Sequence, residues 1–137
     1  MVAVDRSKES MTAVDRSIQI AKQNDAELIA VNILQLPIMS PYTPVVLNSA
    51  IEKGITETDE WFDGIREQAA EKGINIKTKM IRIFGSPSSE IVDFAEKENA
   101  DLIVMGTKGR GKLKKVLLGS TAFGVVMNAP CTVMVVR

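Results

Sequence analysis

The sequence contains no histidine and a single cysteine, Cys131. Histidine is the commonest general base and the commonest metal ligand at neutral pH. Its absence, together with the lone thiol, excludes a zinc site, a Cys–His dyad and a Ser–His–Asp triad. One cysteine cannot close a disulfide within the chain, which is typical of a protein of the reducing cytoplasm.

An excess of charge of one sign and long apolar runs are also lacking. Seventeen basic and seventeen acidic residues give a formal net charge of zero, whereas nucleic-acid and membrane-surface binders usually carry a basic surplus. We find no secretory signal and no apolar run of transmembrane length. The length of 137 residues, 45% of them hydrophobic, predicts one soluble domain, 1–137, without nucleic-acid or membrane partners.

Short apolar runs alternate with amphipathic segments, a pattern that predicts β-α-β-α connectivity around a parallel sheet. We expect strands at 2–4, 28–34, 74–84, 100–105 and 132–137, and helices after Ser7 and at 50–72, 87–96 and 120–128. The first strand is shorter than the usual buried strand, so it remains open whether further residues precede it in the full protein.

Proline and glycine mark the ends of several segments. Pro37, Pro41 and Pro44 fall within 35–49, which we expect to be irregular because proline interrupts helices and central strands. Gly73 is expected to end the long helix before it as the C-cap. The strand at 74–84 carries interspersed lysine and arginine, which predicts a position at the edge of the sheet.

The most informative motif is Gly106-Thr107-Lys108-Gly109, followed after nine residues by Gly119-Ser120. It comes directly after an apolar run that reads as a buried parallel strand. Glycines at this place let backbone N–H groups approach an anion, and the next helix adds further N–H groups and a positive dipole end. The motif therefore predicts a phosphate-binding loop.

The same loop contains the beginning of a P-loop, G-x4-G-K, between Gly106 and Lys112. Leu113 stands where a P-loop has the serine or threonine that holds Mg²⁺, which argues against that interpretation. The loop also carries a basic cluster without any acid. These side chains either form a solvated helix face or, as we favour, steer anions to the loop; they are Lys108, Arg110, Lys112, Lys114 and Lys115.

The spacing G-x2-G-x9-G-[S/T] after a strand resembles the nucleotide-binding motif of the universal stress protein family. Val4-Asp5 with Ser7, Gly85-x-Pro87 and the closing segment 129–136 also fit, so the resemblance covers essentially the whole chain. It implies an α/β fold: an open five-stranded parallel sheet of order 3-2-1-4-5 with helices on both faces, in the Rossmann-like adenine nucleotide alpha-hydrolase-like class. Ligands of such sheets bind at the topological switch point, here between the first and fourth strands.

The resemblance further implies ATP, with or without Mg²⁺, as the ligand. It assigns no catalytic residue and no metal ligand. Ala122 stands where the family often has a hydroxyl residue, so one phosphate contact is expected to be absent, while Lys112 could add charge. The implied site comprises Ala3, Val4, Asp5 and Ile33 around the base and adenosine, Met105 and Gly106 beside the ribose, and Gly109, Arg110, Gly119, Ser120 and Thr121 around the phosphates.

Several of these residues also have a purely structural interpretation, and both interpretations stay open on the sequence alone. Asp5 or Ser120 could cap the helix that follows it. Gly109 could serve only to turn the chain. Met105 and Ile33 are equally compatible with core packing.

Three functions follow. The first is a cytoplasmic, nucleotide-binding regulatory protein of the stress response that hydrolyses ATP slowly or not at all, since no general base lies near the loop. The second is a dimeric interaction module of the same fold without nucleotide. The third is an adenylating enzyme, but Asp5-Arg6-Ser7 lacks the glycine loop or HIGH-type signature of that group. We favour the first, because clustered glycines have no evident use without a phosphate.

The last strand indicates self-association. Residues 132–137 are apolar almost throughout, and in a 3-2-1-4-5 sheet this strand stands at an edge. An unprotected apolar edge favours pairing with another strand, and the family resemblance also implies dimers through this strand. We therefore expect a homodimer about a two-fold axis; the alternative is that another segment covers the edge.

Overall fold

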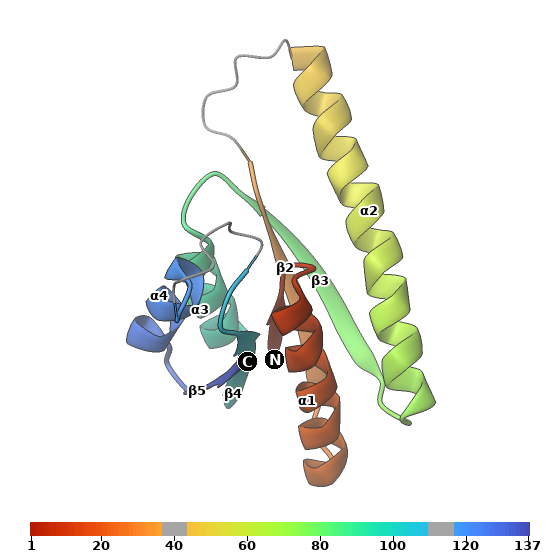
Figure 1. Cartoon of the computed structure of the whole chain (residues 1–137), viewed down its shortest axis with the longest axis vertical. Helices are drawn as coiled ribbons and strands as arrows, with labels where there is room; N and C mark the ends of the chain where they lie inside the picture. The colour runs from red at the N-terminus through yellow and green to blue at the C-terminus, as the bar shows by residue number, and fades with distance from the viewer. Residues whose placement is uncertain (37–43, 110–116) are drawn as a thin grey trace.

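The computed structural model describes residues 1–36, 44–109 and 117–137 (Figure 1). Within these ranges, five strands pair in parallel in the order β3-β2-β1-β4-β5. The predicted sheet order is therefore confirmed, and the charged strand β3 and the apolar strand β5 are the two edges. The strands are β1 (Val2–Val4), β2 (Leu28–Gln35), β3 (Ile76–Ile83), β4 (Leu102–Gly106) and β5 (Thr132–Val136).

Helices cover both faces of the sheet, as predicted. α1 (Lys8–Asn24) and α2 (Pro44–Glu71) pack on one face, and α3 (Pro87–Lys97) and α4 (Ser120–Asn128) pack on the other (Figure 1). None of the helices in the described part of the chain is long and apolar enough to cross a membrane.

The central strand β1 is buried on both faces of the sheet. Val2 and Val4 belong to the hydrophobic cluster under α1 and α2, whereas Ala3 belongs to the cluster under α3 and α4. Successive side chains of a strand point to opposite faces, so three residues suffice to contribute to two cores. The short first strand thus lies in the middle of the fold.

Helix α2 begins at Pro44, so the expectation of irregular structure over 35–49 is wrong from this residue onward. Proline is tolerated in the first turn of a helix, where its missing N–H would have no intrahelical acceptor. β2 likewise continues to Gln35. Pro37 and Pro41 lie outside the described residues.

Two predicted helix ends are confirmed. The Ser7 side chain accepts a hydrogen bond from the Ser10 N–H and caps α1. Gly73 has a φ of +79°; its N–H donates to the Ala70 carbonyl, and the Ile74 N–H donates to the Ala69 carbonyl. This pair of bonds is a Schellman motif, which requires a left-handed residue at the glycine position.

Gly64, within α2, and Gly73, after it, provide a matched test of these backbone effects. A methyl group added at either glycine would meet no atom within 4 Å. Gly64→Ala should raise the free energy of unfolding by about 1 kcal/mol, because alanine favours helix. Gly73→Ala should lower it by about 1 kcal/mol, because the left-handed conformation is strained for a residue with a Cβ. Urea unfolding measures both free energies. Changes of the same sign would contradict the placement of Gly64 inside a helix and of Gly73 at a left-handed helix end.

Candidate functional site

The carboxyl ends of β1 and β4 border a cavity of about 700 Å³. The helix that follows β1, α1, lies on one face of the sheet, and the helix that follows β4, α4, lies on the other. The cavity between these two strands therefore lies at the topological switch point. Its volume is typical of small-molecule sites. Every described residue of the predicted site lines it: Ala3, Val4, Asp5, Ile33, Met105, Gly106, Gly109, Gly119, Ser120 and Thr121. Arg110 and Lys112 lie outside the described residues.

One end of the cavity is apolar. Ala3 pairs in register with Val31 on β2 and with Met105 on β4, so the three side chains form a continuous floor across three strands. Ile91 of α3 faces the same space. Val31 was absent from the predicted site, although it lies two residues before Ile33 on the same face of the strand. Ile91 could not be predicted, because only the packing of α3 brings it there.

The other end of the cavity is formed by the N-terminus of α4. Gly119 is the N-cap and no side chain caps the helix, so the interpretation of Ser120 as the N-cap is wrong. The first intrahelical bond runs from the Phe123 N–H to the Gly119 carbonyl at 2.8 Å. The N–H groups of residues 120–122 therefore have no intrahelical acceptor. Together with the helix dipole, they favour an anion here.

The loop after β4 lies opposite this helix end. The Gly119 N–H donates to the Thr107 carbonyl at 2.7 Å, and the Thr107 N–H donates to the Val136 carbonyl at 2.9 Å. Lys108 lines the cavity between them and is the member of the predicted basic cluster that the structure describes. The loop thus contributes a basic residue, Lys108, to the cavity that the uncapped helix end borders.

The glycines of the motif have packing roles of their own. Gly106 is the last residue of β4 rather than part of the loop, and a Cβ there would lie 2.8 Å from the Glu9 Cβ. A Cβ on Gly109 would collide with Asp5 Oδ2, and one on Gly119 would lie 3.3 Å from the Thr107 carbonyl oxygen. The inference that only a phosphate explains the clustered glycines is therefore wrong, because the close approach of α1 favours glycine at position 106 and close neighbours favour it at 109 and 119.

Asp5 organises the turn between β1 and α1. Its Oδ1 atom accepts from the Ser7 N–H at 3.1 Å and from the Ser7 hydroxyl at 2.6 Å. The interpretation of Asp5 as the cap of α1 is wrong, since Ser7 holds that position and Asp5 orients it. Among the described residues, Asp5 is the one carboxylate that lines the cavity. The described chain also has no cluster of three or more side chains suited to a metal ion.

Comparison with known proteins assigns the chain to a family. The model of the universal stress protein family matches residues 1–137. The chain belongs to this family. A universal stress protein of Methanocaldococcus jannaschii is 39% identical over 142 residues, which cover 100% of this chain and 80% of that relative.

Solved structures of universal stress proteins share the fold. One from Lactobacillus plantarum is 28% identical, has a TM-score of 0.88 and matches 99% of this chain and 95% of its own. One in complex with cAMP is 26% identical, with a TM-score of 0.64 over 99% of this chain and 93% of its own. One from Archaeoglobus fulgidus in complex with dAMP is 20% identical, with a TM-score of 0.70 over 99% and 94%, and shows the fold alone.

The contact between Gly109 and Asp5 can be tested without a ligand. Gly109→Ala should lower the free energy of unfolding by about 1–3 kcal/mol, because the added methyl group collides with the Asp5 carboxylate. The same change should cost less in an Asp5→Ala background, where the carboxylate is gone. Urea unfolding of the four proteins gives both differences. An equal loss of unfolding free energy in the two backgrounds would show that the added methyl group does not act through the Asp5 carboxylate.

Proposed function

We propose that this universal stress protein binds an adenine nucleotide, ATP, in the cavity between β1 and β4. One observation carries the proposal: a single cavity joins the apolar floor of Ala3, Val31 and Met105 to the uncapped N-terminus of α4 beside Lys108. A flat purine suits the first part, and phosphate oxygens suit the second. The cAMP complex of a family member at 26% identity supports an adenine ligand.

In this proposal the residues of the predicted site keep the roles that the family resemblance implies. Met105 and Gly106 would lie beside the ribose. Mg²⁺ would be held chiefly by the phosphates, since Asp5 is the one described carboxylate in the cavity. The base and adenosine would contact Ala3, Val4, Asp5 and Ile33, and the phosphates would contact Gly109, Arg110, Gly119, Ser120 and Thr121.

The proposed role is regulatory, in the cytoplasmic stress response, with slow or no hydrolysis of ATP. Efficient hydrolysis needs a residue that orients or deprotonates the attacking water. The chain has no histidine, and the Asp5 Oδ1 atom is already engaged with both donors of Ser7. These features support binding rather than rapid turnover.

Ser120→Asp separates nucleotide binding from folding. Ser120 is exposed in the first turn of α4, where an acidic side chain stabilises a helix but repels phosphate. The variant should bind ATP at least about tenfold more weakly by calorimetry in the presence of Mg²⁺, with no loss of melting temperature. Ser120→Asn, which has the same shape without the charge, is the control. Equal affinities of the two variants would contradict a phosphate site at this helix end.

We further propose that the protein is a homodimer that pairs through β5. This strand is an edge of the sheet, and Met134 on it is exposed. α4, on the face of the sheet that adjoins this edge, exposes Phe123, Val126 and Met127. A second copy related by a two-fold axis would cover both elements.

Val135→Lys should convert this dimer to a monomer, because a lysine placed in an edge strand opposes pairing. Ile83→Lys is the matched control, since it makes the same kind of change at the opposite edge. Sedimentation equilibrium distinguishes the two. A wild-type protein that stays monomeric at high micromolar concentration would overturn the dimer. A dimer that binds no ATP would favour the alternative function, an interaction module without nucleotide.

A further inference from the structure

The turn between β1 and α1 contains a residue in a strained conformation. Arg6 has a φ of +67°, a left-handed value that residues with a long side chain rarely adopt. Asp5 and Ser7, on either side of it, are joined by two hydrogen bonds. The backbone thus bends at Arg6 while its two neighbours stay in contact. Strain of this kind persists only where surrounding contacts enforce it.

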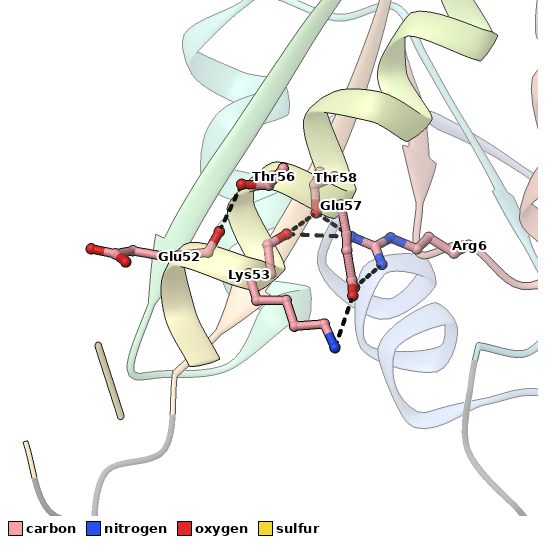
Figure 2. A network of polar contacts seen from close by, with 7 residues as sticks. Arg6, Glu52, Lys53, Thr56, Glu57 and Thr58 are labelled. Atoms are coloured by element: carbon pink, nitrogen blue, oxygen red, sulfur yellow. Dashed lines mark hydrogen bonds and ion pairs between the residues drawn. The ribbon is translucent and has the colours of Figure 1, made fainter. Parts of the chain in front are cut away.

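The enforcing contacts come from α2. Figure 2 shows the Arg6 guanidinium inserted beside this helix, where Nη1 donates to Glu57 Oε2 at 2.9 Å and Nη2 donates to Thr58 Oγ1 at 2.7 Å. Nη2 also lies 3.3 Å from the Gly54 carbonyl oxygen. Thr58 is buried, and its hydroxyl donates to the same carbonyl at 2.7 Å. The planar, charged guanidinium therefore holds several acceptors in a fixed geometry.

On the side away from α2, the turn between β1 and α1 contacts the loop after β4. Ser7 Oγ lies 3.3 Å from the Lys108 carbonyl oxygen, and a Cβ added to Gly109 would collide with the Asp5 carboxylate. The beginning of the loop is fixed independently, by the bonds of Thr107 to Val136 and Gly119. The position of Lys108 and Gly109 over the cavity thus depends on the turn at Asp5 and Ser7.

We infer that Arg6 is a positioning residue of the nucleotide site. It does not line the cavity, but it connects the turn between β1 and α1 to α2. The inference rests on the proposed function. Through its bonds to Glu57 and Thr58, Arg6 holds Asp5 and Ser7 where they support Lys108 and Gly109. The long helix α2 is thereby coupled to the phosphate end of the cavity.

A second tether of α2 provides a matched control. Near the other end of this helix, Gln68 and Lys72 both donate to Asp15 Oδ1 of α1. Asp15 does not line the cavity. Removing it loosens α2 from α1 without changing the turn at Arg6. Loss of stability and loss of nucleotide affinity can therefore be separated.

The experiment compares Arg6→Gly with Asp15→Ala in the whole protein. Glycine keeps the left-handed backbone without a penalty and removes the whole side chain, including the guanidinium that bonds to α2. Arg6→Gly should raise the calorimetric Kd for ATP about tenfold, and Asp15→Ala should leave it within about twofold, with melting temperatures measured in parallel. An Arg6→Gly protein with wild-type affinity would overturn the inference. Equal losses in both variants would also overturn it, because they would reflect general destabilisation.

Thr58→Val tests the same link from the α2 side, since valine keeps the shape and removes the acceptor. It should weaken ATP binding in the same direction, and the double variant with Arg6→Gly should bind no more weakly than Arg6→Gly alone. Fully additive losses would mean that Thr58 and Arg6 act separately, against the inference.

A wild-type protein that binds no adenine nucleotide would overturn the proposed function and this inference with it. Wild-type binding with an unaffected Arg6→Gly variant overturns the inference alone.

Discussion

The close approach of the α1 N-terminus to the carboxyl end of β4 is the constraint on which the site depends. Gly106 lies so near Glu9 and Ser10 that no side chain fits between them. A Cβ on Gly109 would collide with the Asp5 carboxylate. Because glycine has no Cβ to separate these segments, the motif allows the turn after β1 and the loop after β4 to lie close together. The cavity opens beside this contact, on the side of α3 and α4.

The parallel sheet supplies the rest of the site. Carboxyl ends of neighbouring parallel strands meet at one edge, so Val31, Ala3 and Met105 align across three strands although they are far apart in the sequence. The alternation of side chains turns these apolar residues toward α3 and α4. α4 then begins at Gly119 with its N–H groups open to the same space. An apolar floor and an anion-binding helix end are thereby combined in one cavity.

Three residues occupy positions other than the predicted ones, and the reason is the same for each. Pro44 was read as a helix breaker, but its position in the first turn, where no N–H is needed, makes it compatible with α2. Gly106 was read as a loop residue, although its pairing with Val136 keeps it in β4. Ser120 is a residue type that favours the N-cap, but Gly119 takes that place. In each case the residue type allows two local positions, and the neighbouring chain selects one.

The sequence by itself determined the order of strands and helices, the two edges of the sheet and the cavity residues that belong to the glycine motif. These depend on local periodicity, on turn residues and on a spacing that resembles a known family. Only the tertiary structure decided that Ile91 faces the cavity, that the glycines are needed for packing, and that Arg6 joins the turn after β1 to α2. The physical reason is distance along the chain: Arg6 and Thr58 are 52 residues apart, and no local pattern encodes a contact that folding alone creates.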